Sequence, residues 1–253
     1  MSPSPPPRCR ALLFDLDGTL VDSRRDIAAA LNVALEAVGH APLPLEAIVP
    51  MIGDGARTLV ARALAHDERA GGGSGSGSGS GGRALAPTAS ASAASVAAEG
   101  DALLDEVAAL FVRSYAERPV VHTALLPGAR EALEVGLPAA LVTNKPRAVS
   151  VLVLEALGVA SAFGAVFAGG DGPLKPSPDG VRAAAAALGV PIEGAWMIGD
   201  GPQDILAGRA AGCFTIAVPG IADLARVLAA DPHLVVASLH DVARLARASL
   251  TSA

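Results

Sequence analysis

Aromatic side chains are scarce in this chain of 253 residues, which has five phenylalanines, one tyrosine and one tryptophan. Hydrophobic residues still make up 51% of the sequence. We therefore predict a core in which Leu, Val and Ala pack closely, within one large α/β domain or two smaller ones.

Cysteine is also scarce, because Cys9 and Cys213 are the only two. They lie far apart in the sequence and do not form the spaced groups that a disulfide framework or a zinc site requires. We expect both to be reduced thiols in a cytoplasmic protein.

The sequence also lacks a basic stripe and a long apolar run. Its net charge is −6 and its isoelectric point is about 5.3, and its Lys and Arg residues are scattered, which argues against a nucleic-acid partner. No run reaches the roughly 18 apolar residues of a membrane helix. The proline-rich residues 1–10 have no apolar core of the kind signal peptides carry, so they predict a disordered leader and no membrane partner.

Apolar runs alternate with helical patterns from residue 11 onward, the order typical of a mostly parallel sheet covered on both faces. The fold class expected is a three-layer, Rossmann-like α/β core. Strands are predicted at 11–14, 139–142, 165–168, 195–198, 214–218 and 233–236. The main helices are predicted at 24–38, 56–65, 101–117, 203–211 and 241–248.

Residues 22–119 show helical patterns without strand signals. They predict an α-helical cap inserted into a core made of residues 11–21 and 120–253. Within the cap, residues 71–98 are rich in Gly, Ser and Ala, and such a segment cannot bury enough apolar surface to order itself. We expect a flexible loop there, and the sequence is compatible with a natural or an engineered one.

Four polar clusters each follow one of the expected strands. They are Asp15-Leu16-Asp17-Gly18-Thr19, Thr143-Asn144-Lys145, Lys175-Pro176 and Gly199-Asp200-Gly201-Pro202-Gln203-Asp204. Ligands of open α/β sheets bind beyond the carboxyl ends of the strands, so we expect the four clusters to meet at one edge. Their carboxylates, hydroxyl and ammonium group are suited to binding Mg²⁺ and cleaving a phosphate ester.

The first cluster places two carboxylates on one side of an extended chain, because residues i and i+2 point the same way. Asp15 and Asp17 would repel each other unless a cation neutralised them. Gly18 allows a sharp turn there. The alternative is an ordinary polar turn.

Each of the other clusters also has a structural alternative. Thr143 could bind a phosphoryl oxygen or simply cap the next helix. Lys175 could balance carboxylates or be a solvent-facing loop lysine. Asp200 is placed to bind a metal, and Asp204 could orient Lys175 or be an acid favoured by the helix dipole.

Taken together in order, the clusters resemble the haloacid dehalogenase superfamily of phosphatases. The stretch Phe14-Asp15-Leu16-Asp17-Gly18-Thr19-Leu20-Val21-Asp22-Ser23 is similar to the first motif of that family. Thr143 matches the second motif, Lys175 the third, and Gly199-Asp200 with Asp204 the fourth. The resemblance covers nearly the whole chain apart from the leader and the low-complexity loop.

The resemblance implies roles for these residues. Asp15 would be the nucleophile that forms an aspartyl-phosphate, and Asp17 the general acid and base. Thr143 and Lys175 would hold phosphoryl oxygens. Mg²⁺ would lie between Asp15, the backbone carbonyl of Asp17 and Asp200. The supporting residues would be Gly18, Thr19, Asn144 and Asp204.

Within the family, the chain resembles the phosphoglycolate phosphatases. The matching stretches are Val21-Asp22-Ser23, Ile52-Gly53-Asp54-Gly55 and Leu141-Val142-Thr143-Asn144-Lys145-Pro146. The cap residue Arg57 could then meet a substrate carboxylate, or it could be an exposed helix arginine. The loop within the cap and the interval 128–143, about one helical turn short, depart from the family pattern.

The implied enzyme is a phosphoric monoester hydrolase that needs Mg²⁺ and acts on a small phosphorylated metabolite, with 2-phosphoglycolate as the first candidate. It would be a monomer or a homodimer. The alternatives are a phosphomutase or another hydrolase of the family acting on sugar phosphates, and a non-catalytic binding domain on the same fold. A dehalogenase that works without metal would not need acids at both Asp17 and Asp200.

Overall fold

The computed structural model describes residues 6–71 and 93–251, so most of the expected flexible loop and the first half of the expected leader lie outside the described residues. The strands are β1 (Ala11–Phe14), β2 (Val21–Asp22), β3 (Ala124–Leu125), β4 (Ala139–Pro146), β5 (Ala165–Gly169), β6 (Ala195–Gly199), β7 (Phe214–Ala217) and β8 (Leu234–Val235). The α-helices are α1 (Arg24–Ala37), α2 (Leu45–Ile48), α3 (Ala56–Gly71), α4 (Ala93–Glu117), α5 (Ala129–Leu133), α6 (Arg147–Ala156), α7 (Asp179–Ala187), α8 (Pro202–Ala211), α9 (Leu224–Ala229) and α10 (Leu239–Thr251). Within these ranges, no helix is both long and apolar enough to cross a bilayer.

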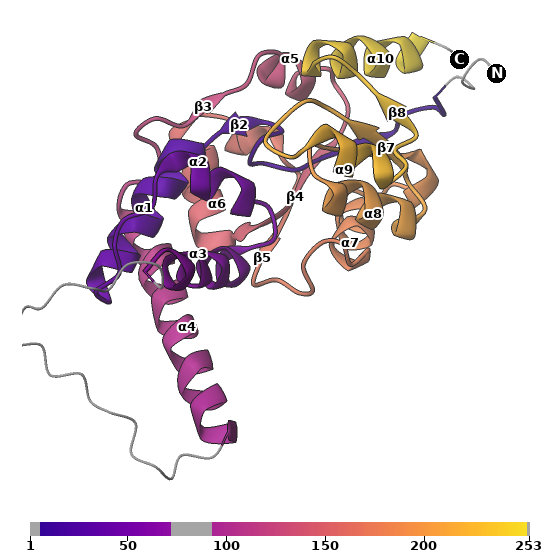
Figure 1. Cartoon of the computed structure of the whole chain (residues 1–253). Coiled ribbons are helices and arrows are strands. Elements are labelled where there is room, and N and C mark those ends of the chain that lie inside the picture. The colour runs from indigo at the N-terminus through magenta and orange to yellow at the C-terminus, as the bar shows by residue number, and fades with distance from the viewer. Residues whose placement is uncertain (1–5, 72–92, 252–253) are drawn as a thin grey trace, which may run out of the picture.

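Six parallel strands form the central sheet in the order β5-β4-β1-β6-β7-β8 (Figure 1). In the middle, β1 pairs Phe14 with Leu141 of β4 on one side and with Ile198 of β6 on the other. The chain builds the β4–β5 edge first and the β6–β8 edge later, so strand order reverses at β1. Such a reversal is where ligands bind in open α/β sheets.

Alternate strand residues face opposite helical layers, as the two-residue period of a strand requires. Leu12 and Phe14 pack in one core with residues of α5, α6 and α10. Leu13, between them, packs in a second core with residues of α7 and α8. The expected three-layer α/β fold is thereby confirmed, with the single tryptophan, Trp196, fully buried in the sheet.

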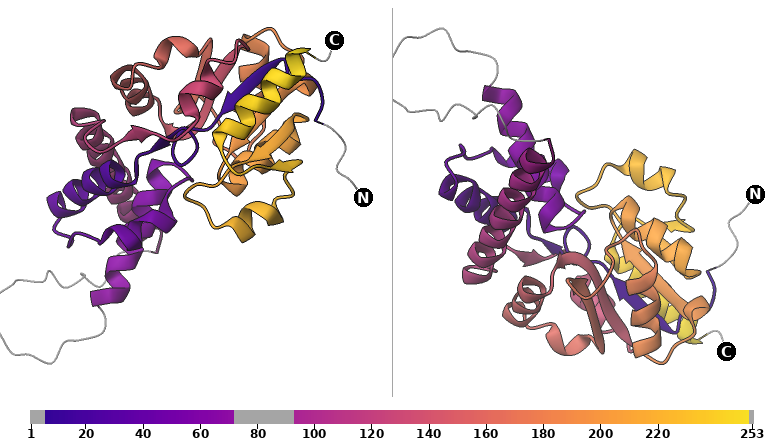
Figure 2. Two further views of the ribbon diagram at one scale, coloured as in Figure 1. Left: turned by 90° about the horizontal axis from the view of Figure 1, so that it is seen from above. Right: turned by 90° about the horizontal axis from the view of Figure 1, so that it is seen from below.

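The helices α1 to α4 form a separate helical segment, which lies to one side of the sheet (Figure 2). The chain enters it after β2 and returns through β3. These two strands pair antiparallel, with Val21 opposite Leu125. Both crossings between the sheet and the helical segment therefore run side by side.

The sequence-based boundaries were wrong at several places. Cys9 is 1% exposed and the Arg10 N–H donates to Gly194 O at 2.8 Å, so the end of the expected leader is part of the core. The helix α4 begins at Ala93, within the stretch expected to be a flexible loop, because its Ala-rich sequence favours helix. The last helix is also longer than expected at both ends.

A buried carboxylate ties the two crossings together. Asp26, in the first turn of α1, is 3% exposed. It accepts hydrogen bonds from the backbone N–H groups of Val121, His122 and Thr123 at 2.8–3.1 Å and from Thr123 Oγ1 at 2.6 Å. Burial alone would raise the pKa of Asp26, but the bonds from the Thr123 hydroxyl and the backbone outweigh it and hold the pKa below its ordinary value.

We expect Asp26→Asn to lower the free energy of unfolding by about 2–3 kcal/mol at pH 7, because an amide cannot accept all these bonds. A depressed folded-state pKa adds stability above the unfolded value, and this stability is lost as the pH falls through the folded value. The difference between wild type and variant should therefore shrink below about pH 4. Urea unfolding at several pH values measures it, with Glu36→Gln on the exposed face of α1 as the control. An equal difference at pH 3 and pH 7 would contradict the prediction.

Candidate active site

The centre of the site is Asp15, the first residue after β1. It is 6% exposed, and its backbone N–H donates to Ile198 O at 3.0 Å, which extends the pairing of β1 with β6. The pKa of the Asp15 carboxyl is raised to about 6: burial is the main cause, the Lys175 ammonium opposes it, and the carboxylates of Asp204 and Asp17 add to it. A carboxylate in this setting needs cationic partners to stay ionised.

The turn after Asp15 requires glycine. Gly18 has a φ of +89°, which L side chains rarely adopt, and its N–H donates to Val21 O at 2.8 Å. A Cβ atom there would also clash with the Asp200 carboxylate. The next residue, Thr19, donates from its hydroxyl to Asp200 Oδ1 at 2.9 Å, so this turn positions a carboxylate from a distant strand.

Lys175 lies between the carboxylates and is not a solvent-facing lysine. Its ammonium donates to Asp15 Oδ1 and Val142 O at 2.7 and 2.6 Å, and lies 2.7 Å from Asp204 Oδ1. Burial by itself would lower the pKa of Lys175, but the charges of Asp15 and Asp204 outweigh it and raise that pKa. The ammonium group is therefore fixed in its charged form.

The backbone of Lys175 is held by Asn144. The Lys175 N–H donates to Asn144 Oδ1 at 2.8 Å, and Asn144 Nδ2 donates to Lys175 O and to Gly53 O, both at 3.0 Å. Gly53 belongs to the helical segment. One amide side chain thus links β4, the Lys175 loop and the helical segment.

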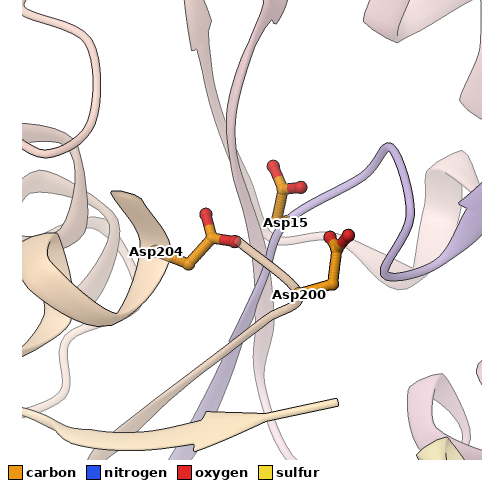
Figure 3. A group of neighbouring side chains, drawn as sticks. All are labelled: Asp15, Asp200 and Asp204. Atoms are coloured by element: carbon orange, nitrogen blue, oxygen red, sulfur yellow. The ribbon is translucent and has the colours of Figure 1, made fainter. Parts of the chain in front are cut away.

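Three carboxylates converge beside Lys175, and Figure 3 shows them directed toward one another. Oxygens of Asp15, Asp200 and Asp204 lie within 4.8 Å of one another. Asp200 Oδ2 accepts from Ile221 N at 2.6 Å, and Asp204 Oδ2 accepts from Gly201 N at 2.9 Å. Burial, together with the Asp15 charge, raises the pKa of Asp200 to about 6.

The charges of this group fit a divalent cation. Three carboxylates face one ammonium group, Lys175, which leaves two negative charges in a buried space. Asp204 is already engaged by Lys175 and Gly201, so Asp15 and Asp200 are the carboxylates best able to take a metal. Carboxylate oxygens are the ligands that Mg²⁺ prefers.

The Asp17 carboxylate is not part of this acidic group. It accepts from Ser23 Oγ at 2.5 Å and from Lys145 Nζ at 2.9 and 3.1 Å. Its side chain lines a cavity between the sheet and the helical segment, together with Asp15 and Thr143. Both carboxylate oxygens of Asp17 are thus engaged by side chains other than those of the acidic group.

Thr143 completes the sheet side of this cavity. It lies in β4 and is 5% exposed, and its hydroxyl accepts from Lys145 N at 3.3 Å. The four expected clusters therefore meet at one edge of the sheet, as the strand-end rule predicts.

Two cations differ from the sequence-based expectations. The Arg57 side chain is 54% exposed and pairs with Asp101 and Asp105 of α4, both at 2.7 Å, and it lines neither of the cavities at Asp15 and Asp200. The expected substrate contact of Arg57 is therefore not supported, and the exposed-arginine alternative describes it better.

Lys145 belongs to the second polar cluster, but the sequence analysis assigned it no role. Its ammonium is buried at the cavity and binds both Asp17 and the Tyr115 hydroxyl. A signal was present, because Lys145 lies two residues after Thr143 in the same polar cluster, and both line this cavity.

A family model described as haloacid dehalogenase-like hydrolase matches residues 9–212. The phosphoglycolate phosphatase of Neisseria meningitidis is 31% identical over 243 residues, covering 92% of each chain. The phosphoglycolate phosphatase of Chromobacterium violaceum is 36% identical over 229 residues, covering 88% of this chain and 90% of its own. These relatives belong to the enzyme class that the sequence predicts.

Solved structures share the fold. A Haemophilus somnus protein described as a predicted phosphoglycolate phosphatase superposes with a TM-score of 0.77 at 24% identity, covering 94% of this chain and 98% of its own. Together, the matched family model and the similarity to both bacterial relatives confirm the resemblance on which the sequence analysis relied. The chain belongs to the haloacid dehalogenase-like hydrolases.

Proposed function

We propose that this enzyme hydrolyses a small phosphomonoester through an aspartyl-phosphate at Asp15. The observation that carries the proposal is the setting of Asp15, which lies buried at the carboxyl end of β1 with Lys175 Nζ 2.7 Å from Oδ1. One carboxylate oxygen is thus held by the ammonium group, and the other is left to attack phosphorus. Carboxylate nucleophiles of this kind split a difficult hydrolysis into two easier steps.

In the first step, an Asp15 oxygen bonds to phosphorus and the bond from phosphorus to the leaving oxygen breaks. Asp17, in its protonated form, gives its proton to that oxygen. In the second step, Asp17 takes a proton from water, whose oxygen bonds to phosphorus and releases inorganic phosphate and the Asp15 carboxylate. Lys175 and the Thr143 hydroxyl hold phosphoryl oxygens throughout, so most of the catalysis is positioning and electrostatics.

We assign the metal as Mg²⁺, held by the carboxylates of Asp15 and Asp200 and the backbone carbonyl of Asp17. Bound there, it would neutralise the charge of the phosphoryl group during transfer. Thr19 and Asp204 support this site: Thr19 orients Asp200, and Asp204 orients Lys175.

The proposed substrate is 2-phosphoglycolate. Both bacterial relatives carry that activity in their names. The cavity beside Asp15 and Asp17 opens directly at the nucleophile, where the leaving group of a small ester can enter. No catalytic carboxylate is missing, which disfavours the non-catalytic alternative.

The helical segment would act as a cap. Residues 22–119 would close the cavity over a core of residues 11–21 and 120–253, excluding water and selecting the leaving group. A cytoplasmic location and a monomer or homodimer remain part of the proposal, and the buried, unpaired thiols of Cys9 and Cys213 are compatible with a reducing compartment.

Asp15→Asn should lower Mg²⁺-dependent phosphate release at least about 10³-fold, because an amide is not a nucleophile. The measurement is phosphate release from a panel of small phosphomonoesters that includes 2-phosphoglycolate and sugar phosphates. Glu193→Gln, at the amino end of β6 and exposed, is the control and should keep full activity. A folded wild type that releases phosphate from no compound would favour the non-catalytic alternative.

Metal removal should make stability depend on pH in a defined direction. The folded-state pKa values of Asp15 and Asp200 are raised to about 6. A raised acid pKa gives stability below the unfolded value, about pH 4, which is lost as the pH rises through about 6. With EDTA, these two residues should therefore lower the melting temperature between pH 5 and pH 7.

Mg²⁺ should restore stability at pH 7 more than at pH 5, because it binds the ionised carboxylates of the folded state. Asp200→Asn should remove most of this Mg²⁺ effect, and its apo form should lose less stability between pH 5 and pH 7. Thermal melts with Mg²⁺ and with EDTA measure both. A Mg²⁺ effect of equal size at the two pH values, or one kept by the variant, would argue against this site.

A further inference from the structure

Lys145 is a second buried ammonium group that the proposed mechanism does not use. Its side chain is 3% exposed. Its Nζ lies 2.9 and 3.1 Å from the two carboxylate oxygens of Asp17 and 2.8 Å from Tyr115 Oη. Burying a charged group is costly even when it has partners. A buried cation at this cavity therefore calls for an explanation beyond packing.

The partner from the helical segment is Tyr115 of α4. Lys145 Nζ lies 4.1 Å from the centroid of the Tyr115 ring, within the range of a cation–π contact. The hydroxyl of Tyr115 accepts from Lys145, and no hydrogen bond donated by this hydroxyl is found among the described residues. The ammonium and this hydroxyl therefore offer donors side by side, at the boundary between the sheet and the helical segment.

Both groups line the cavity that opens beside the nucleophile. Its sheet side is formed by Asp15, Asp17 and residues 143–146. Its other side is formed mainly by apolar groups of the helical segment, Ile27, Ile52, Gly53, Gly55, Ala56, Leu59 and Phe111. Among these lining residues Lys145 is the one cation. A leaving group attached to a phosphoryl group at Asp15 enters this space, where an anionic substituent has one positive partner.

We propose that Lys145 and Tyr115 form the subsite for an anionic substituent, a carboxylate, on the leaving group of the substrate. The carboxylate accepts from Lys145 Nζ and from the Tyr115 hydroxyl, and shares the ammonium with Asp17. Burial raises the pKa of Tyr115, which keeps its hydroxyl protonated and able to donate. This inference rests on the proposed hydrolysis at Asp15 and adds how that site selects acids over neutral esters.

The subsite also makes recognition depend on the helical segment. Lys145 belongs to β4 and Tyr115 to α4, so a carboxylate bound by both joins the two parts of the molecule. Charge-assisted hydrogen bonds are the stronger kind, and the surrounding apolar surface lowers competition from water. Arg57, the cap cation that the sequence left open as a substrate contact, is exposed and paired with two aspartates and does not line this cavity.

The test compares 2-phosphoglycolate with ethyl phosphate, which has a methyl group where the former has a carboxylate. The readout is the ratio of kcat/KM for the two esters, with KM and kcat determined separately. We expect Lys145→Met to lower this ratio at least about 30-fold, mainly by raising KM for 2-phosphoglycolate, in line with the loss of one charge-assisted contact to a buried anion. Lys145→Arg should recover part of the ratio, and Tyr115→Phe should lower it about 3- to 10-fold.

Arg57→Met is the matched control, because it also replaces a cation by methionine, in the helical segment but outside the cavity lining, and its ratio should stay within about 2-fold of wild type. An equal loss of kcat/KM on both esters in Lys145→Met would overturn the inference, since it would reduce Lys145 to a residue that only positions Asp17. If Lys145→Met does not fold, the ratios of Lys145→Arg and Tyr115→Phe decide in the same way.

Failure of the proposed function gives a different result. A wild type that uses both esters equally well would overturn the carboxylate subsite and leave hydrolysis at Asp15 intact. A wild type that releases phosphate from neither ester, or an Asp15→Asn variant as active as wild type, would overturn the proposed function itself.

Discussion

The Lys175 ammonium is the interaction on which the site depends. It lies within 2.7 Å of oxygens of both Asp15 and Asp204, and without it three carboxylates within 4.8 Å of one another would share a buried space with no cation from the chain. Their mutual repulsion would either protonate them or separate β1 from α8. Lys175 reaches this position because Asn144 holds its backbone on both sides. The arrangement of the three carboxylates therefore depends on the position of the loop that carries Lys175.

The sheet brings these groups together because strand order reverses at β1. Asp15 follows β1, Thr143 lies in the neighbour β4 just beyond the residues paired with β1, and Asp200 follows β6 on the other side. All three groups are carried by neighbouring parallel strands, whose pairing sets the spacing between them. The close approach of the β1 turn to Asp200 requires a glycine at position 18. Backbone geometry, more than side-chain choice, thus brings the carboxylates together.

Much of this arrangement could be predicted from the sequence, because polar clusters at the ends of apolar runs report strand order and site position at once. Asp15, Thr143, Lys175 and Asp200 lie where that rule puts them. The role of Arg57 was left open, because a cap arginine that contacts substrate and an exposed arginine have the same sequence pattern. Only the fold shows that its neighbours are the aspartates of α4. The role of Tyr115 could not be predicted from the sequence either, because its partner Lys145 lies 30 residues away in the chain.

The paired crossings at β2 and β3 have a consequence for how such a protein changes over time. Because Val21 and Leu125 face each other, the helical segment has its two ends at one point on the sheet. The first residues of α4 lie far from that point (Figure 1). Residues gained or lost between α3 and α4 therefore leave the strand register and the carboxylates where they are. The long Gly- and Ser-rich stretch in this chain falls at that position. The architecture thus separates the carboxylate site from the position in the chain where its length can change.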